Sequence, residues 1–247
     1  MPPFVMLIIV VLAIVVIIII IKALSRPMPN TDDTELYNAE NDHAYRKYIY
    51  KNTSSSAKPY IDEIFKMVDD INNMVERYNA SYDQARYDAM KSIYDTANRA
   101  EEKIKKCWNN AQFNKDFSFY IGLHYSSHLL GMAIKAEQFK IRDTFVIYKT
   151  KREQEGRCID ELKRKQESAP KSRKAEIGRE IAAHCKLHKQ ICTLTNQIGE
   201  INSNYLKRAT QQNIETAKRR DYIAAHFGKR GMNWKKRIRM RALLHNN

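Results

Sequence analysis

The chain has 247 residues and carries 43 Lys and Arg against 28 Asp and Glu, which gives a formal net charge of +15. Gly (7) and Pro (6) are scarce, although strand-and-turn folds and glycine-rich phosphate loops depend on them and long helices need almost none. The composition therefore favours a basic, mainly helical protein of one or two domains and argues against a collagen-like or disulfide-scaffold chain.

An uninterrupted apolar segment begins close to the N-terminus. The eighteen residues from Phe4 to Ile21, FVMLIIVVLAIVVIIIII, contain no polar side chain. As a helix they extend about 27 Å, which matches the hydrocarbon core of a bilayer. The basic start that is typical of a cleavable secretory signal is missing before this run. We predict an uncleaved transmembrane anchor over residues 1–24, whose partner is the lipid bilayer through residues 4–21.

The charges that flank this anchor predict its orientation. Lys22 and Arg26 follow the apolar run and no basic side chain precedes it, so the positive-inside rule places the C-terminal bulk of this single-pass membrane protein in the cytoplasm. The opposite orientation stays open, because short N-terminal tails also occur on anchors that project their bulk outward. Asn52-Thr53-Ser54 and Asn79-Ala80-Ser81 also match the acceptor pattern for N-glycosylation.

A polar linker and then a long apolar repeat follow the anchor. Residues 25–58 hold prolines, an acidic cluster and a serine run, with room for a short helix around residues 36–50. From Pro59 onward, apolar residues alternate at steps of three and four as far as Cys107. Such a 3.5-residue repeat predicts a long helix that pairs or bundles along one seam.

The second half of the chain predicts further long helices. Residues 117–134 are apolar and aromatic, which favours a core helix, with a membrane-interface segment as the alternative. Another helix is expected over residues 129–167, and the break Ser168–Ser172 separates it from a last helix that starts near Arg173. A short turn between two long amphipathic helices predicts an antiparallel hairpin. The fold class is thus all-α, with a helical bundle or coiled coil over residues 59–216.

Two apolar seams are the expected assembly surfaces. They would carry self-association or pairing with another helical protein, because heptad-spaced apolar residues bury themselves against a partner helix. The seam residues are Ile61, Ile64, Val68, Ile71 and Val75 in the first repeat and Leu187, Ile191, Leu194, Ile198 and Ile201 in the last helix.

Residues 217–247 form a basic C-terminal tail with ten basic side chains and one acidic one. Basic residues interleaved with aromatic ones suit polyanions, because the charges neutralise phosphates while aromatic faces stack on bases or enter a lipid interface. Anionic lipid, nucleic acid, an acidic protein and plain solvation all remain candidates. The expected anion-binding residues are Lys218, Arg219, Arg220, Lys229, Arg230, Trp234, Lys235, Lys236, Arg237, Arg239 and Arg241.

Residues that could serve metal binding or catalysis favour structural roles instead. His184, His188 and Cys192 share one helix face and could supply three metal ligands, but His184 also falls on the apolar seam. We therefore predict no metal and no cofactor. Nucleophile elbows, phosphate loops and HExxH are missing from the sequence, and the carboxylates Glu101 and Glu102 are expected to be solvated, so we predict no enzymatic activity.

These features together predict a single-pass, membrane-anchored helical scaffold or adaptor that self-associates or assembles with other chains. Its basic tail would contact an anionic surface or partner. The alternative is a membrane-tethered nucleic-acid-binding module that uses the same basic and aromatic C-terminus.

Overall fold

The computed structural model describes residues 42–77 and 84–244, with side chains described for residues 42–77 and 86–238. Within these ranges the chain forms six α-helices and one short 3₁₀ helix, η3 (Ala111–Phe113), and no strand. None of the helices in the described ranges is long and apolar enough to cross a bilayer. The predicted anchor, residues 1–24, lies outside the described residues.

The chain divides into two units, residues 1–48 and residues 49–247. The described part of the first unit is the start of helix α2 (Asp42–Asn52), where Arg46 Nε lies 2.9 Å from Asp42 Oδ2 one turn earlier. Residues 42–52 of the predicted polar linker are therefore helical. The last residues of α2 and all the other helices in the described ranges belong to the second unit.

Two helices account for the first apolar repeat. Helix α3 (Lys58–Arg77) and helix α4 (Gln84–Trp108) pack against each other in opposite directions, and Lys103 Nζ near the end of α4 lies 2.6 Å from Glu63 Oε2 near the start of α3. The repeat predicted one long helix, which is wrong. The heptad pattern continues in both helices because each presents its apolar stripe to a common core, with Ile61, Ile64 and Ile93 fully buried.

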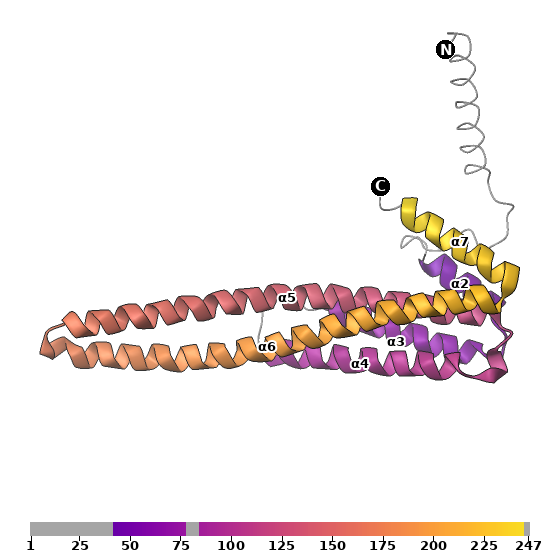
Figure 1. Cartoon of the computed structure of the whole chain (residues 1–247). Helices are drawn as coiled ribbons and strands as arrows, with labels where there is room; N and C mark the ends of the chain where they lie inside the picture. The colour runs from indigo at the N-terminus through magenta and orange to yellow at the C-terminus, as the bar shows by residue number, and fades with distance from the viewer. Residues whose placement is uncertain (1–41, 78–83, 245–247) are drawn as a thin grey trace, which may run out of the picture. The chain divides into compact units, whose positions relative to one another are not determined.

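Two much longer helices form an antiparallel hairpin, as the sequence predicted. Helix α5 (Phe117–Ser168) has 52 residues and helix α6 (Lys171–His226) has 56, so they extend about 78 Å and 84 Å. The turn lies at Ala169 and Pro170 (Figure 1). Residues 117–134, expected as a separate core helix, are the first turns of α5. Asp116 caps this helix, since its Oδ1 accepts a hydrogen bond from the Phe119 amide at 2.9 Å.

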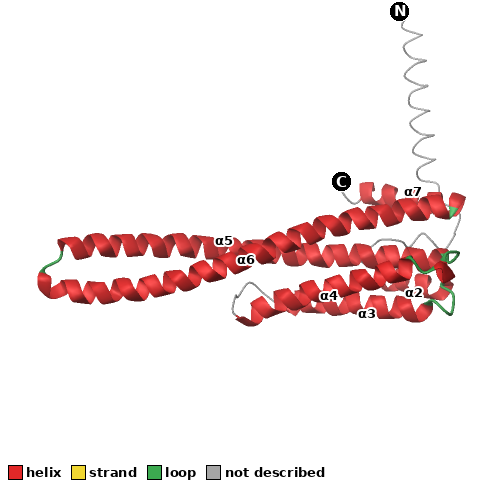
Figure 2. Cartoon of the chain, turned by 60° about the horizontal axis from the view of Figure 1, so that its bottom comes forward, coloured by secondary structure: helices red, strands yellow, loops and turns green. Residues whose placement is uncertain are grey.

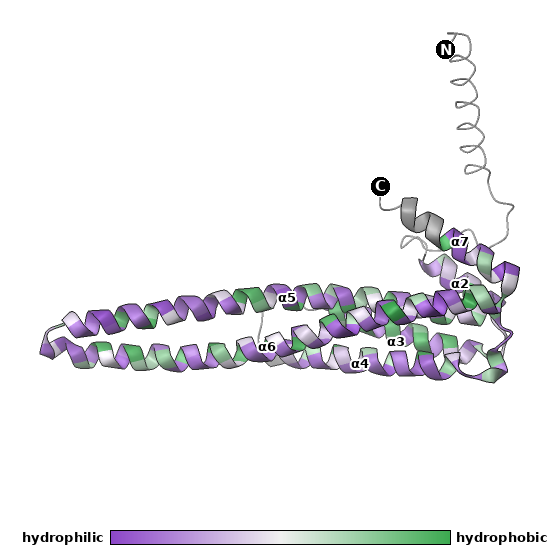
Figure 3. Cartoon of the chain, viewed as in Figure 1, coloured by the Kyte–Doolittle hydropathy of each residue, from purple (hydrophilic) through white to green (hydrophobic). Residues whose placement is uncertain are grey.

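Helices α3 and α4 accompany only one half of the hairpin (Figures 1 and 2). We call this half of the second unit the proximal body (residues 49–145 and 198–238) and the remainder of α5 and α6 the distal hairpin (residues 146–197). In the distal hairpin only Ile159, Thr195 and Ile191 are buried. Hydrophilic residues prevail along its α5 side (Figure 3). The core therefore lies in the proximal body.

Candidate functional site

The basic C-terminal region forms a folded elbow between α6 and the last helix, α7 (Gly228–Leu244). Helix α6 continues past residue 216, where the tail was predicted to begin, and ends at His226. Gly228 then adopts a left-handed φ of 54°, which reverses the chain and which side chains with a Cβ rarely tolerate. At Gly231 an added Cβ would lie 2.2 Å from the Ile223 carbonyl oxygen, so the backbones of α7 and α6 are in direct contact.

Side chains of α7 dock it onto helices α5 and α6. Trp234 is 1% exposed, and its ring meets the His124 imidazole edge-to-face with centroids 5.0 Å apart. Lys235 Nζ lies 2.9 Å from Asp221 Oδ1 on α6. The Arg230 guanidinium lies 4.2 Å above the ring of Phe117, a cation–π contact with the start of α5. Helix α7 is thus held by a buried tryptophan, an ion pair and a cation–π contact.

Several predicted anion-binding residues lie on the outer side of this docked helix. Lys229, Arg230 and Lys236 are exposed, and Met232 between them is 47% exposed. We call these four residues the basic face of α7. Lys229 and Lys236 form no ion pair with another described residue, so their ammonium groups are available to an external anion. Lys218 on α6 is also exposed, with Nζ 3.5 Å from Glu215 Oε1.

Other members of the predicted anion-binding set are committed within the protein. Trp234 and Arg219 are buried, which contradicts the expectation that they meet an external polyanion. Arg220 and Lys235 both pair with Asp221. Arg237 is half-buried, and the side chains of Arg239 and Arg241 lie outside those described.

Arg219 belongs to a buried polar cluster that the sequence did not predict. Its two terminal nitrogens donate to both carboxylate oxygens of Glu101 on α4, the Nη1–Oε2 distance being 3.1 Å. Gln212 Nε2 donates to Glu101 Oε2 at 2.9 Å and to Ser127 Oγ at 2.7 Å. Arg219 Nη1 also donates to Ser127 Oγ at 2.6 Å. The expectation that Glu101 is solvated is wrong, because this cluster ties α4, α5 and α6 together in the core.

A second buried ion pair lies farther along the proximal body. Arg86 Nη2 of α4 lies 2.6 Å from Glu137 Oε1 of α5, and both side chains are almost fully buried. Burial raises the pKa of the Glu137 carboxyl, and the nearby Arg86 opposes that shift. Tyr205 of α6 donates its hydroxyl to the Met90 carbonyl at 2.7 Å. The three helices are therefore held in one register by directional contacts as well as by apolar packing.

Beside the docked α7, burial controls the titration of the imidazoles. His124 is 3% exposed, and this burial lowers its pKa well below 6.5, with smaller contributions in the same direction from His128, Arg220 and Arg219. Burial also lowers the pKa of His128. Both imidazoles are therefore neutral at physiological pH, which suits the contact between His124 and the Trp234 ring.

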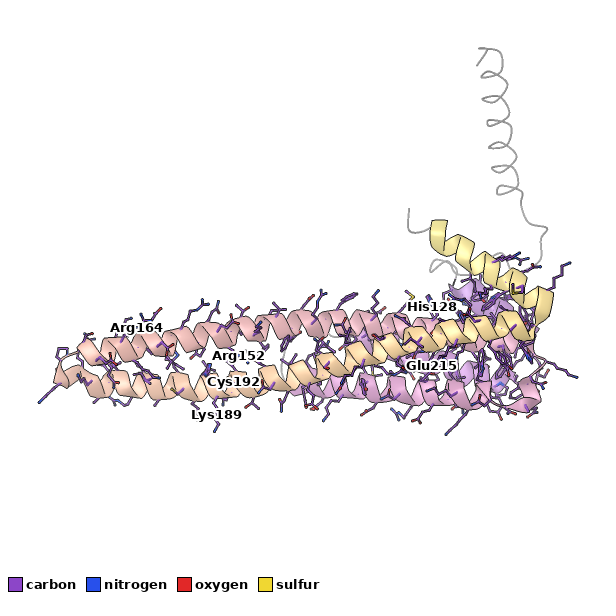
Figure 4. The ribbon with its side chains drawn as sticks, in the orientation of Figure 1. His128, Arg152, Arg164, Lys189, Cys192 and Glu215 are labelled. Atoms are coloured by element: carbon purple, nitrogen blue, oxygen red, sulfur yellow. The ribbon has the colours of Figure 1, made fainter. Side chains whose placement is uncertain are left out.

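A small hollow opens on the surface next to the buried cluster. It has a volume of about 390 Å³, and Lys105, Trp108, Glu215, Lys218 and Tyr222 are among its lining residues. The rings of Trp108 and Tyr222 meet edge-to-face with centroids 5.3 Å apart. Glu215, which Figure 4 marks on α6, supplies the carboxylate of this rim. The hollow combines aromatic walls with two exposed ammonium groups, and its lining comes from the end of α4 and from α6.

The residues considered as metal ligands lie in the distal hairpin. His184 Nδ1 lies 2.5 Å from Glu155 Oε1 on α5, whereas Cys192 Sγ lies 3.8 Å from His188. His188 and Cys192 line a second, open hollow of about 640 Å³, together with Arg152 of α5 (Figure 4). Across the described ranges, no group of three or more His, Cys, Asp and Glu side chains is placed to hold a metal ion.

The predicted assembly seams are largely internal to the chain. Ile61, Ile64, Val68 and Ile71 are fully buried and Val75 is 5% exposed, all within the core that α3 shares with its neighbouring helices. In α6, Ile191 and Ile198 are buried and Leu194 and Ile201 are half-buried, whereas Leu187 is 45% exposed. Of the ten seam residues, only Leu187 is strongly exposed to a possible partner.

The chain matches no protein-family model, and comparisons with curated proteins and with solved structures gave no match. Its function is therefore inferred from the arrangement of its own residues. The features that carry this inference are the basic face of α7 and the distal hairpin, which the rest of the described chain leaves uncovered.

Proposed function

We propose that this protein is a single-pass, membrane-anchored helical adaptor that presents the distal hairpin to protein partners and the basic face of α7 to an anionic surface. The length of the hairpin is the observation that carries this proposal. Helices α3 and α4 have 20 and 25 residues against 52 and 56 for α5 and α6. About 35 Å of paired helix therefore has both sides available for binding. A stem of this kind suits a scaffold, because it offers a long binding surface that its own core does not cover.

The anchor in this proposal is the apolar run of residues 4–21, which lies outside the described residues. Its eighteen consecutive apolar side chains are the supporting observation. Lys22 and Arg26 support an orientation with the helical bulk in the cytoplasm. A membrane-impermeant maleimide should then label an Asn246→Cys variant only after lysis, whereas labelling in intact cells would place the bulk outside.

The exposed charges of α7 favour an anionic membrane surface over nucleic acid. Stacking on bases needs an accessible aromatic face, and Trp234, the one aromatic residue in α7, is buried against His124. The basic face of α7 instead combines Lys229, Arg230 and Lys236 with the exposed thioether of Met232. Cationic side chains around an apolar one suit the headgroup region of an anionic leaflet, where each cation contributes about 1 kcal/mol.

The experiment separates the anchor from the basic face within the full-length chain. The substitutions Leu12→Asp and Val16→Asp place two charges in the centre of the apolar run, which should release the protein from membranes under alkaline extraction. The matched substitutions Leu12→Ala and Val16→Ala should leave it membrane-bound. The anchor would be contradicted if the Asp and Ala variants were both released from membranes, or if neither was.

The released Asp variant then tests the basic face on vesicles. It should bind vesicles that contain phosphatidylserine, bind weakly to neutral phosphatidylcholine vesicles, and lose binding when Lys229 and Lys236 are replaced by Glu. The same charge change at Lys163 and Lys171 in the distal hairpin is the control and should preserve binding. Salt-sensitive binding to duplex DNA that the Lys229 and Lys236 substitutions abolish, without vesicle binding, would support the nucleic-acid-binding alternative instead.

A further inference from the structure

Three side chains meet across the distal hairpin in an order that suits nucleophile activation. Glu155 and Cys158 lie one turn apart on α5, and His184 faces them from α6. His184 Nδ1 lies 2.5 Å from Glu155 Oε1, and His184 Nε2 lies 4.0 Å from Cys158 Sγ. One imidazole therefore connects a carboxylate with a thiol, which is the carboxylate–imidazole–nucleophile order found in triads of hydrolytic enzymes.

The carboxylate determines how the imidazole faces the thiol. An ionised carboxylate only accepts hydrogen bonds, so its short contact requires the proton of His184 to reside on Nδ1. The lone pair of Nε2 is then directed toward the Cys158 sulfur and can accept the thiol proton. The Glu155 side chain is 15% exposed and that of His184 35% exposed, while Cys158 is half-buried. The thiol thus lies beside an imidazole that can accept its proton, and a small reagent can still reach it.

The other three cysteines differ from Cys158. Cys192 Sγ is 3.8 Å from both ring nitrogens of His188, so the sulfur lies beside the ring and not along the lone pair of one nitrogen. Cys185 is exposed on the surface of α6. Cys107 is buried in the proximal body, where desolvation raises the pKa of its thiol. Cys158 alone among the four combines access with an imidazole that a carboxylate orients.

We propose that Cys158 is a reactive thiol that forms a mixed disulfide with small disulfides such as oxidised glutathione. His184 takes the Cys158 proton, and the thiolate sulfur attacks one sulfur of the disulfide. The bond between the two reagent sulfurs breaks as the new sulfur–sulfur bond forms, and the departing thiolate receives the proton from the His184 imidazolium. Glu155 is a positioning residue that fixes the tautomer and stabilises the imidazolium.

The hollow near this site carries charges of both signs. Arg152 and Arg157 line the open hollow of about 640 Å³ on the same stretch of hairpin, together with Glu153 and Asp160. The two guanidinium groups are therefore matched by two carboxylates, and Cys158 lies outside this lining. These charges select neither an anionic nor a cationic disulfide, so oxidised glutathione serves as a general small disulfide.

The test measures mixed-disulfide formation on the full-length chain in detergent micelles. The parent for this test carries Cys185→Ser and Cys192→Ser. It is mixed with oxidised glutathione, and mass spectrometry of the intact protein measures how fast glutathione is added. His184→Asn should slow the reaction by at least about tenfold and Glu155→Gln by a smaller factor, because each variant impairs proton transfer. The matched control His188→Asn should react at the parent rate.

Two further measurements distinguish chemistry from structure. The reaction rate of His184→Asn should approach the parent rate as the pH rises above about 8.5, where thiols ionise without a base. A purely structural defect would keep the rate low there. In the unsubstituted chain, peptide mapping should find glutathione on Cys158 before Cys185. The proposal is overturned if Cys185 reacts as fast as Cys158 or if His184→Asn reacts at the parent rate.

Discussion

The buried contact between Glu101 and Arg219 yields a sharp test of how the proximal body is held together. Both side chains are 6% exposed or less, and the guanidinium binds both carboxylate oxygens. We consider two substitutions that remove the charges without large changes in volume, Glu101→Leu and Arg219→Met. Each single change leaves the opposite charge buried without its partner, whereas the double change removes both.

The burial of this pair determines the expected magnitudes. Breaking a buried ion pair at one side costs about 3–5 kcal/mol, because an uncompensated charge remains in a region of low dielectric. Replacing both partners by apolar residues is often neutral or stabilising. Gln212 Nε2 would keep its 2.7 Å hydrogen bond to Ser127 Oγ in the double variant. We therefore expect each single variant to lose about 3–5 kcal/mol and the double variant to lie within about 2 kcal/mol of the parent.

Urea unfolding of the full-length chain in detergent, followed by far-ultraviolet circular dichroism, measures these losses. Glu63→Leu is the matched control, because Glu63 also pairs with a cation across two helices but is 53% exposed, and its partner Lys103 is 29% exposed. Such surface pairs contribute less than about 1 kcal/mol. The reasoning is refuted if Glu101→Leu costs no more than Glu63→Leu, or if the double variant is as unstable as the single ones.

Two further predictions concern the docked α7. Burial lowers the pKa of His124 well below its unfolded value of 6.5, so stability is complete above that pH and falls as the pH decreases toward the folded pKa. His124→Gln should shrink this pH dependence in thermal unfolding, and an unchanged pH profile would contradict the role of His124. Gly231→Ala should lower stability by about 1–3 kcal/mol and expose α7 to trypsin, because its Cβ would lie 2.2 Å from the Ile223 carbonyl oxygen. Asn233→Ala on the exposed side of α7 is the control, and equal trypsin sensitivity of the two variants would argue against the close contact.

Apolar periodicity predicted much of the fold. The spacing of Ile61, Ile64 and Val68 identified residues that are fully buried, and the break at Ser168 predicted the turn between α5 and α6. Periodicity did not distinguish one long helix from α3 and α4 folded back on each other, because both arrangements continue the same heptad pattern. It also did not distinguish an internal core from an interface between chains, since both bury the same apolar stripe.

The polar contacts of the core were harder to predict. Glu101 and Arg219 are separated by 118 positions, and nothing in the local pattern of either residue signals burial. The basic residues around Arg219 predict contact with an external anion, whereas its guanidinium is buried. The meeting of Cys158 with His184 was accessible in principle, because the two lie at similar distances from the hairpin turn, but it required the register of α5 against α6.

The separation of these contacts along the chain also determines the order in which the protein can fold. The distal hairpin pairs residues that are close in sequence, so it can form quickly once the turn at Ala169 and Pro170 has been synthesised. The proximal body depends on contacts such as Tyr205 with Met90 and Arg219 with Glu101, which span 115 and 118 positions. Until ribosomes have completed α6, Glu101 has no buried cation and the apolar stripes of α3, α4 and α5 have an incomplete cover. Synthesis that stops before Arg219 would release chains whose hairpin is formed but whose core is open, and these should depend on chaperones or be degraded.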